Sequence, residues 1–196
     1  MNRQSSVNLM VKVALLSVIS FVIMFIEFPL PLFPPFLKID LSDIGALVGT
    51  FAFGPVAGIA IELLKNILHL MRTSTGGVGE LANFLVGAAL VAPAGFVYAR
   101  NKTMKSALLG LALGTITMGV VGAFANYYII IPFYSNFMPI DQIIGMAQAA
   151  NSLIVDLKSY IIYAVIPFNI LKGIAVSVLT LLIYKRISPL LHSNNQ

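Results

Sequence analysis

The chain has 196 residues, of which 59% are hydrophobic and 10% charged, and its mean hydropathy is +0.95. Soluble domains are about 25% charged, so this composition predicts an integral membrane protein without a fused ATPase or receptor domain. The sequence has no cysteine, which excludes a disulfide framework, a Cys zinc site and a thiol nucleophile. The basic residues behind the formal charge of +5 flank apolar runs, so they indicate orientation in a lipid bilayer and no nucleic-acid binding.

The first predicted span covers residues 8–28, and Lys12 is near enough to its start for the ammonium to reach the headgroups. A cleaved signal peptide is the alternative, but no small-x-small cleavage site follows the run. Four prolines between residues 29 and 35 then end the helix, because proline lacks an amide donor and clashes with the preceding turn. Residues 29–43 are therefore predicted to form a rigid outer loop.

The apolar region 44–71 is too long for one ordinary span, and Gly54-Pro55 interrupts it, so it is either a kinked helix or a helical hairpin. Cytoplasmic loops near membrane ends are enriched in Lys and Arg, and only the hairpin places the basic cluster of residues 100–105 on the cytoplasmic side with the termini. The sequence thus predicts one all-α membrane domain, residues 1–196, built as a six-transmembrane-helix bundle with both termini cytoplasmic. Its spans are expected at about 8–28, 44–54, 55–71, 80–99, 105–130 and 160–186.

Residues 131–159 are predicted to form the second outer loop. Five apolar residues recur within it at roughly helical spacing among polar ones: Ile140, Ile143, Ile144, Met146 and Ala147. The spacing favours a short helix lying over the outer mouth of the bundle, and a plain surface loop is the alternative.

Polar residues inside the last span mark a candidate site, because a charge near mid-bilayer costs about 2.5 to 3.5 kcal/mol on insertion scales. Pro167 is suited to open a helix, and Asn169 and Lys172, three residues apart, then share one face near its outer end. Together with Phe168 they place an aromatic ring, an amide and an ammonium at one helix end, an arrangement that suits a planar polar ligand. The alternative is an internally paired lysine that closes the bundle.

The fourth span carries a second polar stripe near the outer surface. Its members lie at i, i+3, i+4 and i+7 and so share a helical face: Glu80, Asn83, Phe84 and Gly87. An asparagine there either meets a ligand or satisfies a neighbouring backbone group. The preceding TSTGGVGE segment lacks the Gly-Lys-Ser/Thr ending of a phosphate-binding loop, so we expect no nucleotide hydrolysis by this chain.

The third span has a stripe of its own: Glu62, Lys65, Asn66 and His69. Glu62 and Lys65 can neutralise one another, which favours a structural role. A proton relay through Glu62, Lys65 and His69 is the alternative, and it would make the chain a proton-coupled secondary transporter. Such folds often have two similar halves, which this sequence lacks. A lone histidine makes no metal site, and no nucleophile lies beside a base, so neither an enzyme nor a resident cofactor is expected.

A resemblance to a known family is carried by residues 33–70 (FPPFLKIDLSDIGALVGTFAFGPVAGIAIELLKNILHL), 79–102 (GELANFLVGAALVAPAGFVYARNK) and 167–173 (PFNILKG). In order and spacing, over almost the whole chain, the sequence resembles the substrate-binding S component of energy-coupling factor vitamin transporters, in particular its riboflavin-specific members. The resemblance implies a six-helix vitamin binder in the bacterial cell membrane with riboflavin as its transported ligand. It also implies three partner subunits: an integral-membrane T component and two cytoplasmic ATPases.

Carried over by position, the resemblance puts the first loop over the ligand, with Lys38, Asp40 and Leu41. It places polar contacts on the outer parts of the fourth to sixth helices, at Glu80, Asn83, Asn126, Asn169 and Lys172. An isoalloxazine ring has two carbonyls, ring nitrogens and one imide N–H along a flat edge, which amides and an ammonium can recognise. Phe168 or Leu41 can pack on the ring, and Phe84 shares the face of Asn83.

The resemblance also concerns docking to the T component. The family's first helix often carries two alanines four residues apart as a docking patch. In this sequence Ala14 is followed by Val18, so the docking surface departs from that pattern.

Overall fold

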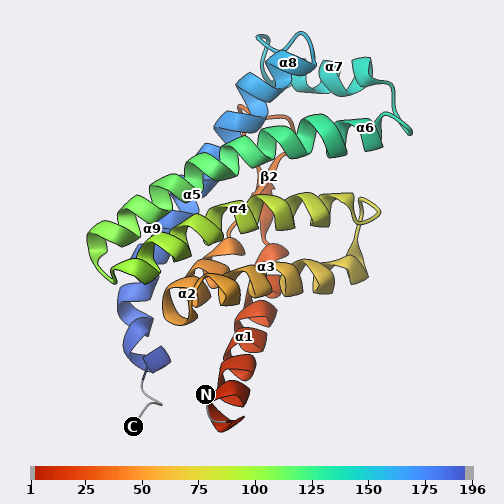
Figure 1. Ribbon diagram of the computed structural model, residues 1–196. Coiled ribbons are helices and arrows are strands. Elements are labelled where there is room, and N and C mark those ends of the chain that lie inside the picture. The colour runs from red at the N-terminus through yellow and green to blue at the C-terminus, as the bar shows by residue number, and fades with distance from the viewer. Residues whose placement is uncertain (1–2, 193–196) are drawn as a thin grey trace.

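The computed structural model describes residues 3–192, with side chains described from residue 6 to residue 184. It is a mostly helical bundle, in which α4 and α5 run side by side and the α7–α8 region projects at one end (Figure 1). Four stretches of the described chain are long and apolar enough to cross a membrane: Ser6–Met24, Val78–Arg100, Met104–Tyr134 and Leu157–Tyr184. The predicted orientation also depends on Arg3, Lys185 and Arg186, whose side chains lie outside the described ones.

The first helix, α1, covers Arg3–Met24 and ends before the prolines that were expected to stop it. Between α1 and α2 the chain forms two short antiparallel strands, β1 (Glu27–Pro29) and β2 (Lys38–Asp40), with Glu27 opposite Asp40. The all-α prediction missed this pair, because strands of three residues show no alternating pattern that a sequence can reveal.

The region after β2 is a helical hairpin rather than a kinked helix. Helix α2 covers Asp43–Phe53, α3 covers Pro55–His69, and the 3₁₀ turn η1 (Leu70–Arg72) follows. Gly54 between them has φ +98, a conformation that favours glycine. The two helices lie antiparallel, since Gly58 faces Thr50 and Gly49 faces Ile61. Helices of 11 and 15 residues are shorter than an ordinary span of about 20.

The remaining helices form the long part of the bundle. Helix α4 covers Val78–Arg100 and α5 covers Met104–Ala125. The chain continues through the π turn η2 (Asn126–Ile130), α6 (Ile131–Tyr134), α7 (Ile140–Ala150), α8 (Leu157–Tyr160), a second π turn η3 (Ile161–Val165) and α9 (Ile166–His192). The two π turns contact each other, so α5 and α9 both change their helical pitch at the same level.

The predicted short helix of the second outer loop is confirmed as α7. Its buried residues are Ile143, Ile144 and Ala147, whereas Ile140 and Met146 are exposed. The buried face packs into the smaller of two core clusters, together with Ile154, Tyr160 and Val165. The larger cluster lies among α2, α3, α4, α5 and α9 and contains Leu47, Ile61, Leu90, Met118 and Val176.

Helices α4 and α5 approach closely because α5 has glycines where the two meet. A Cβ atom on Gly114 would overlap the Leu90 carbonyl oxygen, and one on Gly110 would lie 2.8 Å from the Ala94 oxygen. By contrast, Gly145 on α7 is exposed and has no atom within 4 Å of such a Cβ position. Small residues at a helix contact, such as Gly110 and Gly114, let membrane helices pack at short distance.

We expect Gly114→Ala to lower the free energy of unfolding by about 1 to 3 kcal/mol, because two helix backbones must separate. The matched change Gly145→Ala should raise it by about 0.5 to 1 kcal/mol, since alanine is the better helix former and meets nothing there. Thermal unfolding of both variants in detergent measures this. Equal shifts of the two melting temperatures would contradict the close approach of α4 and α5.

Candidate functional site

Five charged side chains form a continuous chain in the interior. Lys172 Nζ lies 2.8 Å from Asp40 Oδ2 and 3.2 Å from Asp43 Oδ2. Lys65 forms an ion pair with Asp43 Oδ1, and its Nζ lies 2.8 Å from Glu62 Oε2. No side chain of the five is more than 6% exposed. Negative and positive groups thus alternate from Glu62 through Lys65, Asp43 and Lys172 to Asp40, and we call this set the ion chain.

Local structure positions the acidic end of the ion chain. Asp40 ends β2, and Asp43 lies in the first turn of α2, where the helix dipole favours a carboxylate. The Ser42 backbone N–H donates to Asp40 Oδ1 over 3.0 Å, the Ser42 hydroxyl donates to the same oxygen, and Lys65 Nζ donates to Ser42 Oγ over 2.8 Å. Burial alone would raise the pKa of Asp40, but the ammonium groups of Lys172 and Lys65 hold that pKa well below its usual range.

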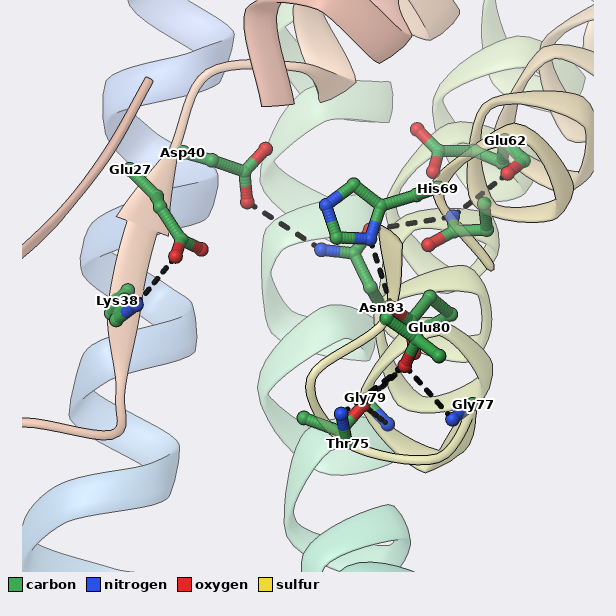
Figure 2. Close-up of polar contacts among 12 residues, drawn as sticks. Glu27, Lys38, Asp40, Glu62, His69, Thr75, Gly77, Gly79, Glu80 and Asn83 are labelled. Atoms are coloured by element: carbon green, nitrogen blue, oxygen red, sulfur yellow. Dashed lines mark hydrogen bonds and ion pairs between the residues drawn. The ribbon is translucent and has the colours of Figure 1, made fainter. Parts of the chain in front are cut away.

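Two amides extend the ion chain toward α4. Asn83 Nδ2 lies 3.5 Å from Asp40 Oδ2, and Asn66 Nδ2 lies 3.4 Å from Asn83 Oδ1. Figure 2 shows Asn83 reaching toward Asp40 across the space between α4 and β2. Both contacts are longer than the usual 2.7 to 3.2 Å, so they hold Asn83 weakly. Asn66 Oδ1 is buried and has no hydrogen-bond partner in the described part of the chain.

A second polar group lies where α5 meets α9. Tyr160 donates its hydroxyl proton to Asn126 Oδ1 over 3.2 Å, and Asn126 Nδ2 donates to the Gly122 carbonyl over 2.9 Å. A Cβ atom on Gly122 would lie 2.6 Å from Asn169 Nδ2, so Asn126 and Asn169 are neighbours across the two helices. Asn169 is three residues before Lys172 on α9, and this places the second group beside the ion chain.

An aromatic pair accompanies the asparagines. The Phe168 ring is buried, and its centroid lies 5.4 Å from that of Phe33 in the first outer loop, in an edge-to-face arrangement. Phe36 of the same loop has its centroid 6.1 Å from that of Tyr160. The first loop therefore contacts the start of α9 and the neighbouring α8, and a role of this loop in covering a ligand stays a prediction.

Glu80 is engaged elsewhere. Its Oε1 lies 2.9 Å from His69 Nδ1, and its Oε2 accepts hydrogen bonds from the hydroxyls of Thr73 and Thr75 at 3.0 and 2.9 Å. Figure 2 shows Glu80 beside the turn that joins α3 to α4, between His69 and Thr75. The contacts fix this turn on the first residues of α4. His69 is thus paired with Glu80, whereas Glu62 and Lys65 belong to the ion chain, so the three residues of the predicted proton relay fall into two different groups.

The other predicted site residues have varied positions. Lys38 is exposed and pairs with Glu27 Oε1 across the β1–β2 pair, at 2.5 Å. Leu41 packs against the larger core cluster, and Phe84 is partly buried on α4. Ala14 and Val18 are exposed on α1. The structure thus brings together Asp40, Asn83, Asn126, Phe168, Asn169 and Lys172, while contact of any of them with a ligand stays a prediction.

Sequence reasoning missed three members of the site: Ser42, Asp43 and Tyr160. For Asp43 a signal exists, because two lysines inside a membrane bundle need interior carboxylates, and Asp43 follows Asp40 by three residues. No comparable signal marks Tyr160, which meets Asn126 only because the π turns η2 and η3 pack against each other. In the described part of the chain, no three His, Cys, Asp or Glu side chains are grouped so as to hold a metal ion.

Comparison with known proteins places this arrangement in a family. The family model for the substrate-specific component of ECF transporters matches residues 8–184. The riboflavin transporter RibU of Staphylococcus aureus (strain TCH60) is 39% identical over 96% of this chain and 94% of its own length. The riboflavin transporter FmnP of Bacillus subtilis (strain 168) is 35% identical over 93% of each chain.

A solved structure described as "Structure and mechanism of the S component of a bacterial ECF transporter" is similar in fold as well. Its TM-score is 0.76 at 36% identity, covering 95% of this chain and 99% of that one. The bundle is thus an S-component fold, in agreement with the resemblance found in the sequence. The chain belongs to the family of substrate-specific components of ECF transporters.

Proposed function

We propose that this chain is the riboflavin-binding S component of an ECF importer in the bacterial cell membrane. It captures the vitamin at the outer face, and a T component with two ATPase subunits drives uptake. The observation that carries the proposal is that Asn169 and Lys172 share one face near the start of α9, where Asn169 and Asn126 both lie against Gly122 and Phe168 packs on the first loop. The relatives named riboflavin transporters support the choice of ligand.

The chemistry of these side chains suits the polar edge of a flavin. The Lys172 ammonium has three protons, and its two carboxylate partners leave one to donate to a ring carbonyl or nitrogen. Asn169 donates to the Val165 carbonyl over 2.9 Å, which leaves its Oδ1 to accept the imide proton. Phe168 supplies an apolar ring surface. Internal pairing of Lys172 and ligand binding are therefore compatible.

A six-span topology with cytoplasmic termini is part of the proposal, and ring contacts support it. The Phe51 centroid lies 4.9 Å from that of Tyr98 and 5.6 Å from that of Tyr184, so the ends of α2, α4 and α9 meet. Lys12 Nζ, in α1, lies 5.8 Å from the ring centroid of Phe53 at the same end. Successive segments therefore alternate between this end and the end that carries the two outer loops (Figure 1).

We expect cysteines at two exposed positions, Thr103 and Ser152, to differ in labelling. Thr103 lies in the turn between α4 and α5, on the proposed cytoplasmic side, and Ser152 follows α7 outside. The chain has no native cysteine to interfere. In intact cells an impermeant thiol reagent should modify Ser152→Cys, and should modify Thr103→Cys only after permeabilisation. Labelling of Thr103→Cys in intact cells would contradict the topology.

Purified protein tests the ligand directly. Riboflavin should bind at one molecule per chain, and Asn169→Leu should raise the Kd about 5- to 150-fold, because a hydrogen bond to a buried ligand is worth about 1 to 3 kcal/mol. The matched control is Asn101→Leu in the exposed α4–α5 turn, which should leave the Kd unchanged. If the unmodified protein binds no riboflavin, the proposed function is wrong. If the unmodified protein binds riboflavin and Asn169→Leu binds it with the same Kd, the proposed function stands and only the assignment of Asn169 to the site is wrong.

A further inference from the structure

Two members of the ion chain have no part in the function proposed above. Glu62 and Lys65 belong to α3 and contact neither Asn126 nor Asn169. Both are fully buried, and Lys65 connects them to Asp40 and Lys172 through Asp43 and through the Ser42 hydroxyl. A buried ion pair is seldom kept for stability alone, because apolar residues of similar volume often stabilise a core as well or better. Their position relative to Lys172 therefore calls for an explanation.

Asp43 is the link between the two halves of the ion chain. Its Oδ1 pairs with Lys65, and its Oδ2 lies 3.2 Å from Lys172 Nζ. Lys172 is in turn closer to Asp40, at 2.8 Å. Because Lys65 neutralises part of the Asp43 charge, the attraction of Asp43 for Lys172 is weaker than it would otherwise be. The balance leaves Lys172 closest to Asp40, the residue that ends strand β2.

The far end of the ion chain is fixed by close packing. A Cβ atom on Gly87 would overlap the Glu62 carboxylate, so α4 has its glycine where Glu62 lies against it. Glu62 is thereby confined beside Lys65, and Lys65 also donates to Ser42 Oγ over 2.8 Å. Lys65 is thus held on two sides, by Glu62 on α3 and by Ser42 at the start of α2.

We propose that Lys65, held in place by Glu62, is a positioning residue for the ligand site: by neutralising Asp43 it keeps Lys172 paired with Asp40, and so keeps β2 and the first loop docked against α9. The inference rests on the proposed function and extends it to residues that do not touch the ligand. Removing Lys65 draws Lys172 toward Asp43, frees Asp40 and loosens the loop that covers the flavin.

A paired set of variants tests the proposal. Glu62→Gln with Lys65→Met removes both partners of the Glu62–Lys65 contact and keeps the approximate volume of each side chain. This double variant should raise the riboflavin Kd about 10-fold or more, within the usual range of coupling between contacting residues. Adding Asp43→Asn leaves Lys172 and Asp40 as a single pair and should restore the Kd to within about 3-fold of the unmodified protein. The absorption bands of the bound flavin should shift in the double variant and return in the triple variant.

Three outcomes overturn the proposal. One is unchanged riboflavin affinity in the double variant, and another is weakened affinity that Asp43→Asn does not restore. Thr50→Val, an isosteric change at another buried polar residue of α2, is the control and should leave the Kd unchanged. If the double variant does not fold, Lys65→Gln replaces it, because glutamine keeps much of the side-chain volume but removes the charge that neutralises Asp43. Unchanged affinity in Lys65→Gln is the third. Failure of the unmodified protein to bind riboflavin refutes the proposed function instead.

Discussion

Replacing Lys172 by methionine is expected to abolish measurable riboflavin binding and to destabilise the ligand-free protein by about 3 to 5 kcal/mol. Methionine fills a similar volume but leaves Asp40 and Asp43 buried beside each other without the ammonium that lies 2.8 and 3.2 Å from their oxygens. Riboflavin titration and thermal unfolding in detergent measure the two effects. Lys158→Met, an exposed lysine of α8, is the matched control and should change both by less than about 0.5 kcal/mol.

A Lys172→Met protein as stable as the unmodified one would contradict the ion pairs. The sequence alone suggests the opposite effect on stability, because an unpaired ammonium near the outer end of a span would be relieved by an apolar replacement. The structure changes this expectation by showing two carboxylate partners for the lysine. Loss of binding together with loss of stability is therefore the result that the contacts predict.

The chain alone, reconstituted in liposomes, is expected to bind riboflavin without accumulating it against a gradient. Concentrative uptake should require the T component, both ATPase subunits and ATP, because this sequence has no phosphate-binding loop. Radiolabelled riboflavin inside proteoliposomes, with and without the partner subunits, measures the difference. Without the partner subunits, the riboflavin concentration inside the liposomes should at most equal the concentration outside. With the partner subunits and ATP, it should exceed the concentration outside.

A proton gradient provides the contrary test. Accumulation driven by a pH gradient in the absence of ATPase subunits, and lost in His69→Gln, would support the proton-coupled alternative. The structure gives that alternative little support, since His69 pairs with Glu80 while Glu62 and Lys65 belong to the ion chain. His69→Gln should therefore leave ATP-driven uptake intact, apart from a modest loss of order in the α3–α4 turn.

Much of the bundle could be predicted from the sequence because its signals are local. Long apolar runs mark α4, α5 and α9, and Gly54-Pro55 marks the reversal between α2 and α3. The β1–β2 pair had no such signal. Its strands are short, and their pairing depends on the loop being held against α9 by contacts that only the folded chain makes.

In the candidate site, too, residues marked by local signals could be predicted and long-range contacts could not. Asn169 and Lys172 could be identified because residues three positions apart on one helix share a face. The pairing of Lys172 with Asp40 joins residues 132 positions apart in the chain, and no periodicity encodes such a contact. Glu80 shows the converse, because helical spacing placed it on the face of Asn83, whereas nearby hydroxyls and His69 take both of its oxygens.

The two π turns determine how the site responds to a different class of mutation, the one-residue deletion. Each holds one more residue than the α-helical turn that would occupy its place. Deleting a single residue from Ile161–Val165 would let the turn close as an α-helix, with the segments on either side keeping nearly the same relative rotation, so the hydrogen bond from Tyr160 to Asn126 should survive. A deletion between Asn169 and Lys172, within the α-helical part of α9, would instead rotate the two sides by about 100° relative to each other. One-residue deletions should therefore be tolerated better in the ten positions of η2 and η3 than in the neighbouring α-helical segments.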